Sequence, residues 1–285
     1  MLGFVNILKP TGVSSGYVVN KVKRLTKEKV GHLGTLDPLA TGVLPIAVGK
    51  ATRFFDYFLQ KEKKYFALAK FGVETDTLDS EGKILSIKKV SVALEDVKKV
   101  SQELVGEIMQ MPPIFSAKSV GGVRAYEAAI KNQDIQLEPK KVSIYSIDVA
   151  PWEQDDVFAI KIHCSSGTYV RAIIRDIAEK LNTKATTVAI IRTKSGKFEI
   201  DSAVTLEDFE KNISESLIKI NEVLQLPKLD VSGDMARDLF SGKELDFFGE
   251  DGEYLTFLNN EEFSVALVKD KKIKNKIYLY NKEKV

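Results

Sequence analysis

GHLGTLDPLATGVLP, residues 31–45, is the most informative stretch of this 285-residue chain. It holds three glycines that allow close backbone approach, a single carboxylate at Asp37, and His32 five residues earlier. Turn-forming residues recur as far as Gly49, and they predict a functional loop over Gly31 to Gly49. Because Asp-Pro pairs often begin turns, the residues alone leave Asp37 either a catalytic carboxylate or a structural one.

The segments around this stretch predict helices and a strand. Ser14-Ser15 offers a capping hydroxyl, and the residues after it place Val18, Val19, Val22 and Leu25 on one helical face. Further along, the spacing predicts a short buried helix at Phe54, Phe55 and Phe58, a strand over 65–71, an acidic turn over 74–82 and a helix over 94–104.

The central third of the chain alternates strand and helix patterns. Residues 142–149 and 158–164 alternate as strands do, and residues 168–181 predict a helix that ends near Asn182. Arg171 and Arg175 share one face of that helix. This mixture predicts an α+β (mixed α/β) core around a mixed, mostly antiparallel sheet.

Leu226-Pro227 is the best candidate for a domain boundary, which divides the chain into 1–226 and 227–285. The second part predicts one short helix ending near Gly242 and strands over 253–258, 263–269 and 276–280, with a solvated hairpin at 269–276. It is too short to hold a large core, so we expect it to lean on the first part.

Composition excludes several classes of protein. Cys164 is the single cysteine, and His32 and His163 are the only histidines, so no disulfide framework or zinc ligand set is expected. No apolar run is long enough for a membrane span, and residues 1–8 lack the features of a secretory signal, which predicts a cytoplasmic protein. Gly42 to Lys50 lacks the spacing of a phosphate-binding loop, and no dinucleotide-binding glycine motif occurs.

Charge is distributed unevenly although the whole chain carries only +2. Residues 1–64 carry +7, residues 65–200 carry +1 and residues 201–285 carry −6. A basic N-terminal part favours contact with a nucleic acid, and an ordinary solvated basic face is the alternative.

Several short motifs occur in a fixed order on both sides of residues 31–45. They are Lys9-Pro10-x-Gly12-x-Ser14-Ser15, Lys64-Tyr65, Gly72 with Thr75-Asp76-Thr77-x-Asp79-x-x-Gly82, Pro112-Pro113-x-x-Ser116-Ala117, Arg124-Ala125-Tyr126-Glu127 and Cys164-Ser165-x-Gly167-Thr168-Tyr169-x-Arg171. Together with residues 31–45 they resemble the bacterial tRNA pseudouridine synthase B family, over roughly residues 3–205. The resemblance fades in the tail.

The resemblance implies that the protein isomerises the T-loop uridine at position 55 of tRNA to pseudouridine, with no cofactor and no metal. Asp37 matches the essential aspartate, which acts by covalent addition or by proton abstraction at the sugar. Burial alone would protonate such a carboxylate, and Arg171 matches the arginine that opposes this by pairing with it.

The resemblance also implies four further substrate-binding residues. Tyr65 matches the tyrosine that stacks on the target base, whereas by itself it would be read as a core residue. Tyr169 and Ile190 match a polar aromatic position and an apolar wall of the pocket. His32 matches the histidine associated with displacing the uridine from its stack, which a base-flipping enzyme needs. His163 lies in an alternating strand and is expected to be structural.

The same resemblance covers two other regions. Residues 112–136 are similar to the insertion with which the family grips RNA, and the tail corresponds to a small C-terminal domain that is PUA-like in many members. Two departures stand out: Ile190-Ile191-Arg192-Thr193 replaces Leu-Arg-Arg-Thr, and Ser119 replaces a lysine. Both are expected to weaken RNA binding without affecting Asp37.

Three hypotheses about function remain open. The first is a stand-alone tRNA pseudouridine synthase, a monomer that binds the T arm and T loop with its basic N-terminal part and residues 161–197. The second is a tRNA-binding folding aid in which catalysis is secondary. The third is a guide-RNA-dependent relative, which the lack of a long basic tail disfavours.

Overall fold

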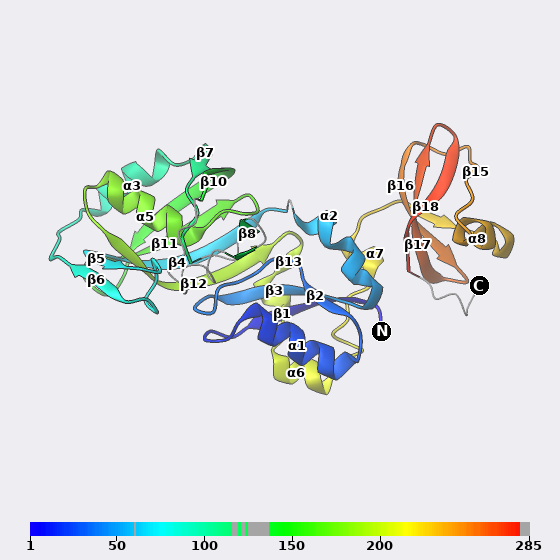
Figure 1. Cartoon of the computed structure of the whole chain (residues 1–285), viewed down its shortest axis with the longest axis horizontal. Coiled ribbons are helices and arrows are strands. Elements are labelled where there is room, and N and C mark those ends of the chain that lie inside the picture. Colours follow the sequence, from blue (N-terminus) through cyan, green and yellow to red (C-terminus); the bar gives the residue numbers. More distant parts are fainter. Residues whose placement is uncertain (60, 116–118, 121–122, 125–136, 280–285) are drawn as a thin grey trace.

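The computed structural model of the chain describes residues 1–59, 61–115, 119–120, 123–124 and 137–279. It has an α+β fold with a large mixed sheet and a separate small β-rich lobe, as the sequence predicts (Figure 1). Among the described residues, no helix is long and apolar enough to cross a membrane.

The large sheet carries the candidate site. Its main strands lie in the order β1 (Gly3–Lys9), β3 (Thr41–Val48), β12 (Ala185–Ser195), β4 (Lys63–Phe71), β11 (Val157–Cys164), β10 (Lys140–Pro151) and β7 (Gly106–Gln110). Two short strands pair with inner strands of this sheet: β2 (Val30–His32) with β3 and β13 (Phe198–Glu199) with β12. The β3–β12 pair is parallel and the other pairs are antiparallel.

Helices α1 (Ser15–Thr26), α3 (Leu94–Gln102) and α5 (Val170–Lys180) form where the sequence predicts them. Ser14 caps α1 by accepting a hydrogen bond from the Tyr17 amide, and Asn182 adopts a positive φ of 54° just after α5. The apolar face of α5 is buried in the main core through Ile173, Ile174 and Ile177. Its long apolar stripe therefore holds α5 against the sheet that carries the site.

Six strands of the large sheet were not predicted: β1, β2, β3, β7, β12 and β13. The expected loop over Gly31 to Gly49 is wrong for residues 41–48, which form β3 and are buried from Gly42 onward. β1 and β3 are buried almost throughout, so they read as mostly apolar runs without alternation, whereas β12 is only partly buried and mixes apolar with polar residues. Gly42 has φ 106°, and a Cβ there would collide with the backbone of Arg192, so this glycine permits the close pairing of β3 with β12.

The phenylalanine-rich segment forms a 3-10 turn, η1 (Gly49–Phe54), followed by α2 (Phe55–Leu59). Phe54 and Phe58 are buried as predicted, but the expectation is wrong for Phe55, which is 40% exposed. Phe54 and Phe58 pack on the ring of Phe4, whereas Phe55 lies on the helix side that faces the cavity described below.

A second, five-stranded sheet forms the small lobe at the right of Figure 1. It contains β14 (Lys228–Asp230), β16 (Gly252–Leu258), β17 (Glu261–Lys269), β18 (Lys272–Tyr278) and β15 (Leu245–Asp246), with α8 (Gly233–Phe240) beside it. The predicted strands and helix are confirmed, except that the last strand begins earlier and Tyr280 lies outside the described residues. Asp270 and Lys271 both have positive φ, which makes the tight turn of the predicted hairpin.

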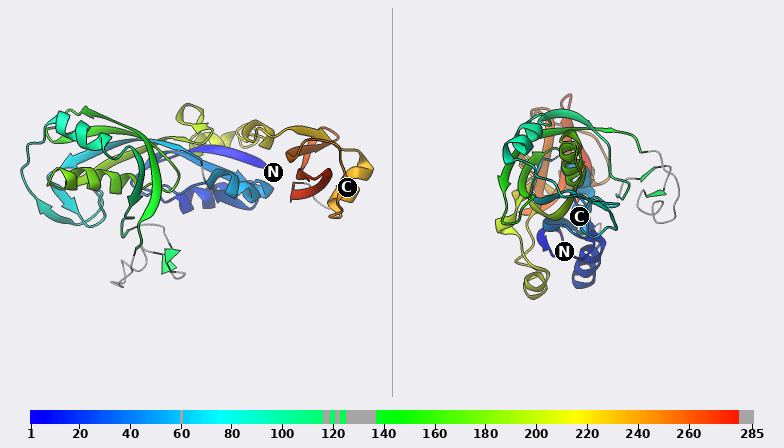
Figure 2. Two further views of the ribbon diagram at one scale, coloured as in Figure 1. Left: turned by 90° about the horizontal axis from the view of Figure 1, so that it is seen from above. Right: turned by 90° about the vertical axis from the view of Figure 1, so that its left-hand side faces the viewer.

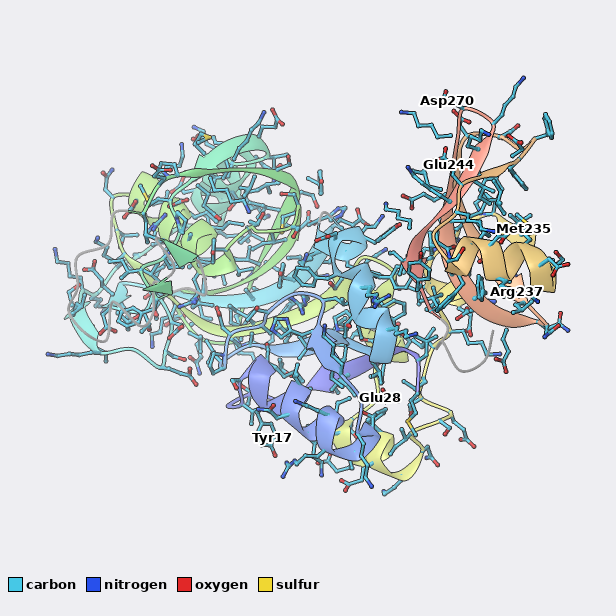
Figure 3. The ribbon with its side chains drawn as sticks, turned by 45° about the vertical axis from the view of Figure 1, so that its right-hand side comes forward. Tyr17, Glu28, Met235, Arg237, Glu244 and Asp270 are labelled. Atoms are coloured by element: carbon cyan, nitrogen blue, oxygen red, sulfur yellow. The ribbon has the colours of Figure 1, made fainter. Side chains whose placement is uncertain are left out.

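The two sheets share an apolar cluster. Phe4 of β1 belongs to it together with Leu255, Val265 and Ile277 of the second sheet. The second sheet also has its own core, which includes Leu239 and Phe263. As expected from its size, the small lobe leans on the larger part, and Figure 2 shows the two side by side along the long axis. Figure 3 shows Met235 and Arg237 of α8 on the side of the small lobe that faces away from the large sheet.

Smaller elements complete the chain: β5 (Val73–Thr75) and β6 (Ile84–Ile87) flank the predicted acidic turn, and α6 (Leu206–Lys211), α7 (Ile220–Val223) and a 3-10 turn, η2 (Ile200–Ser202), lead to the small lobe. The expected RNA-gripping insertion, 112–136, lies mostly outside the described residues. Within it, β8 (Ser119–Val120) and β9 (Val123–Arg124) pair as a short hairpin.

Candidate active site

Asp37 lies in the connection between β2 and β3. Leu33 and Leu36 are each 4% exposed and anchor this loop in two apolar clusters. The Asp37 carbonyl accepts a hydrogen bond from the Ala40 amide at 3.1 Å, which closes a turn around Pro38. The turn and the candidate catalytic residue thus coincide, and the two interpretations of Asp37-Pro38 are compatible.

Polar groups from distant parts of the chain fix the backbone of this loop. The buried Ser15 hydroxyl bonds both the amide and the carbonyl of Leu36, each at 2.9 Å. The Lys9 ammonium, which is fully buried, donates to the carbonyls of Pro10, Val13 and Pro38 at 2.9, 2.7 and 3.2 Å. Burial lowers the pKa of Lys9 to about 8.

Arg192 of β12 supports the same loop from behind. Its guanidinium donates to the carbonyls of Val43, Thr35 and Gly34 at 2.8, 3.1 and 2.9 Å, and the residue is 1% exposed. No ion pair with a carboxylate forms at Arg192 among the described residues. Lys9 and Arg192 therefore correct the expectation that the basic residues of residues 1–64 and 161–197 face RNA phosphates: these two are structural cations inside the protein.

Arg171, in the first turn of α5, joins two carboxylates. Its Nη2 lies 2.7 Å from Asp37 Oδ2 and its Nη1 lies 3.0 Å from Asp79 Oδ2. The Arg171 side chain is 5% exposed, whereas that of Asp37 is 37% exposed. The carboxylate is therefore open to a ligand on one side while the guanidinium holds it from the other, as the predicted pairing requires.

The position of Arg171 is fixed by further contacts. It donates to the carbonyls of Thr77 and Phe115 at 2.7 and 2.9 Å. Asp79 is held in turn by the Thr77 hydroxyl at 2.6 Å and the Glu81 amide at 3.1 Å. Asp79 stands in one of the motifs quoted above but was not predicted to have a role. The sequence pattern that could have revealed it is the run of turn-forming hydroxyl and carboxylate residues that ends at Gly82.

A cavity of about 410 Å³ opens beside Asp37. A volume in this range accommodates a nucleoside-sized ligand. All six residues predicted from the sequence line it, although they come from four separate parts of the chain: His32, Asp37, Tyr65, Tyr169, Arg171 and Ile190. His163 lies outside it and pairs with Glu62 at 2.9 Å.

The cavity has apolar walls and few polar groups. Ile190 and Tyr65 are 4% and 8% exposed, and Leu36, Phe58 and Val170 complete the apolar lining. Burial raises the pKa of Tyr65 to about 12, so its hydroxyl stays protonated. The cavity therefore offers apolar surfaces beside the partly exposed carboxylate of Asp37.

Two other cationic residues, Lys63 and Lys140, also line the cavity and were not predicted as site residues. Phe55 is a third lining residue that had been assigned to the core. Among the described residues, no group of three or more His, Cys, Asp or Glu side chains is arranged to hold a metal ion.

Residues 22–170 match the family described as TruB family pseudouridylate synthase (N terminal domain). Curated relatives named tRNA pseudouridine synthase B are similar over most of the chain. The protein from Caldanaerobacter subterraneus is 37% identical over 243 residues, which cover 85% of each chain. That from Clostridium acetobutylicum is 40% identical over 227 residues, which cover 79% of this chain and 78% of the relative.

Solved structures share the fold at lower identity. The chain in a structure of an H/ACA RNP bound to a substrate RNA containing 2'-deoxyuridine superposes with a TM-score of 0.70 and 21% identity. The match covers 99% of this chain and 86% of that one. A Cbf5-Nop10-Gar1 complex gives the same TM-score at 22% identity. The likeness covers both the large sheet and the small lobe.

Proposed function

This chain belongs to the TruB family of pseudouridylate synthases, and we propose that it isomerises the T-loop uridine at position 55 of tRNA to pseudouridine. Membership of the family makes it an isomerase. The tRNA substrate is supported by the name that its relatives carry. In the reaction the N1–C1′ bond breaks, the uracil turns, and C5 bonds to C1′; C5 releases a proton and N1 gains one.

Asp37 is the proposed catalytic residue, and the observation that carries the proposal is its ion pair with Arg171 at the base of the cavity. Addition of the carboxylate to the nucleotide and proton abstraction at the sugar both require an ionised Asp37. In the structure the Asp37 carboxylate is paired with the Arg171 guanidinium at 2.7 Å. Arg171 also fixes where the carboxylate lies, which matters because small displacements of reacting groups are costly.

The remaining lining residues are proposed to bind the flipped nucleotide. A base inside a folded T loop must leave its stack to reach Asp37, at a cost of a few kcal/mol. Tyr65 and Ile190 offer surfaces on which uracil packs, Tyr169 stands beside Arg171, and His32 lies at the loop that carries Asp37. The protonated Tyr65 hydroxyl adds a polar contact without adding charge.

The test is tritium release from C5-tritiated uridine in unmodified tRNA, with purified protein and no added cofactor. We expect release at one T-loop uridine, and Asp37→Asn should abolish it while tRNA binding changes little. Asp56→Asn, an exposed carboxylate on α2, is the matched control and should release tritium normally. Turnover by Asp37→Asn would remove Asp37 from the catalytic role.

The same assay separates the two alternative functions. Tight tRNA binding without release by the wild-type protein would favour a folding aid or a partner-dependent enzyme. We further propose that the protein acts as a cytoplasmic monomer without an obligatory protein partner. Residues 1–226 would form the catalytic domain and residues 227–285 a small, PUA-like RNA-binding domain.

A further inference from the structure

The cavity beside Asp37 carries more positive charge than the proposed nucleoside needs. Asp37 is its one acidic lining residue among those described, whereas four lining residues are lysine or arginine. Arg171 is paired with Asp37 and Asp79, and Arg192 is engaged by backbone carbonyls. Lys63 and Lys140 remain. Uracil and ribose are both neutral, so neither balances these two ammonium groups.

Lys63, on β4, is a buried ammonium group at the edge of the cavity. It is 6% exposed, and its Nζ donates to the Lys61 carbonyl at 3.2 Å. An ammonium can donate three hydrogen bonds, and no carboxylate among the described residues pairs with this one. Burial, and then the positive charge of Arg192, lower the pKa of Lys63 to about 8. An anion would therefore stabilise its charged form.

Lys140, at the start of β10, extends across the turn that precedes α5. A Cβ built on Gly167 would lie 2.6 Å from Lys140 Nζ, and Gly167 has φ 81°. The glycine therefore leaves the space through which Lys140 enters the cavity lining. Gly34, which has φ 142°, lies beside Lys63: a Cβ built on Gly34 would be 3.6 Å from Lys63 Cε, an ordinary van der Waals contact. Both lysines enter the cavity beside a glycine with positive φ.

The next residue on each strand behaves differently. Lys64 is exposed on the opposite face of β4, because successive side chains of a strand alternate. Lys141 forms an exposed ion pair with Glu107 at 2.9 Å. The charge at the cavity is thus specific to Lys63 and Lys140 and is not a general property of a basic surface.

We propose that Lys63 and Lys140 form a binding site for a phosphodiester group of the substrate RNA, next to the flipped uridine. The inference rests on the proposed function, since it names the part of the RNA that this cavity holds besides the nucleoside. Two ammonium groups beside one cavity suit a phosphodiester, which carries one negative charge and oxygen atoms that accept several hydrogen bonds.

The test is a double-mutant cycle that combines the removal of a lysine charge from the protein with the removal of a phosphate charge from the RNA. Lys63→Met and Lys140→Met each remove an ammonium group, and Lys64→Met and Lys141→Met are their matched controls. The RNA is a T-arm stem-loop with one methylphosphonate, which is uncharged, placed either 5′ or 3′ of the target uridine. Dissociation constants come from filter binding, and tritium release is measured on the same RNAs.

We expect one of the two methylphosphonates to weaken binding by the wild-type protein about tenfold, or about 1.4 kcal/mol. The same substitution should weaken binding less than twofold in Lys63→Met and Lys140→Met, because their contact is already lost. Lys64→Met and Lys141→Met should respond like the wild type. Equal tenfold losses in all five proteins would overturn the proposal, as would no loss with either methylphosphonate.

Failure of this proposal is distinguishable from failure of the proposed function. If the wild-type protein binds the stem-loop but releases no tritium, the proposed function alone is contradicted. If tritium is released but the methylphosphonate weakens binding equally in the wild type and in the lysine variants, the phosphodiester site alone is contradicted. If the buried Lys63→Met does not fold, as circular dichroism would show, the exposed Lys140→Met decides the result.

Discussion

The two buried arginines at this site, Arg171 and Arg192, have different roles. Arg171 spans two carboxylates and stands behind the open carboxylate of Asp37. Arg192 contacts backbone carbonyls, two of them in the loop that bears Asp37. Guanidinium is suited to both tasks, since its planar fork presents five donors in fixed directions. The first arginine therefore sets the charge around Asp37 and the second sets its position.

Arg192→Lys should lower both stability and turnover. One ammonium cannot reach all three carbonyls, and buried acceptors left without donors cost roughly 1–3 kcal/mol each, so we expect a loss of about 2–4 kcal/mol in urea unfolding. Turnover in the tritium assay should fall about 10- to 100-fold because the Asp37 loop loosens. Arg237→Lys, at an exposed pair with Asp234, is the control and should change neither. Normal turnover by Arg192→Lys would show that the loop with Asp37 keeps its position without the Arg192 hydrogen bonds.

Lys9 should make stability depend on alkaline pH. Its pKa is about 8 when folded and about 10.5 when unfolded, so between these values the unfolded chain binds the extra proton. The free energy of unfolding therefore rises with pH across this window, and below pH 8 the cost of burying the charge is fully present.

The Lys9→Met variant lacks this titrating group. Lys63, Tyr65 and Cys164 are present in both proteins, so their contributions to the pH dependence cancel in the comparison. The stability of the wild type minus that of the variant should thus grow by about 2–3 kcal/mol between pH 8 and 10 in urea unfolding. A constant difference would mean that the three carbonyls keep Lys9 protonated in the folded protein.

At the scale of elements, helix α1 has both a local and a long-range hydroxyl at its start. Ser14 caps the helix through the Tyr17 amide at 3.1 Å, which affects this helix alone. Ser15 is buried and bonds Leu36, 21 residues away, one position before Asp37. The parallel pairing of β3 with β12 likewise places Arg192 opposite Gly42, directly behind the same loop. Helix α1 and strands β3 and β12 therefore all contribute to the position of the loop that carries Asp37.

Ser14→Ala and Ser15→Ala should separate these two roles. Loss of the cap should cost about 1 kcal/mol with unchanged turnover. Loss of the Ser15 hydroxyl leaves the Leu36 amide and carbonyl without their partner, so we expect about 1–3 kcal/mol and slower turnover. Urea unfolding and the tritium assay measure the two effects. If both variants kept normal turnover, Ser15 would have no part in positioning Asp37.

At the scale of the whole molecule, the two sheets are joined by the apolar cluster around Phe4. Val265 of β17 belongs to this cluster, whereas Val268 of the same strand belongs to the core of the small lobe. Polar contacts accompany the cluster: the Tyr57 hydroxyl donates to Glu253 at 2.5 Å, and Arg53 donates to the Tyr278 carbonyl at 3.0 Å. The small lobe is thus fixed to the end of the large sheet where β1 begins.

Val265→Ala and Val268→Ala form a matched pair for this junction. Each removes the same buried atoms and should cost about 2 kcal/mol. Only Val265→Ala should accelerate amide hydrogen exchange in Gly3–Lys9, because Phe4 packs in the cluster that it weakens. Equal exchange of β1 in both variants would show that the small lobe does not stabilise the large sheet.

The six predicted site residues were found through the resemblance of their motifs to the tRNA pseudouridine synthase B family. The residues by themselves left Asp37 open between a catalytic and a structural role and would have placed Tyr65 in the core. Helices α1, α3 and α5 were also predictable, since each has an apolar face with a period of about 3.6 residues. Of the five strands of the small lobe, β16, β17 and β18 were predicted, and the short β14 and β15 were not. The turn at Asp37-Pro38 was visible in its residue types alone.

The tertiary structure alone decided the strands that are buried on both faces and the fate of the buried cations. β1 and β3 show no alternation, because nearly all of their residues are buried. Lys9 and Arg192 look like surface charges in the sequence, and Asp79 lies 92 residues from the arginine it contacts. Whether a charge is buried or solvated depends on which carbonyls and carboxylates surround it after folding, and no local pattern of residues encodes those neighbours.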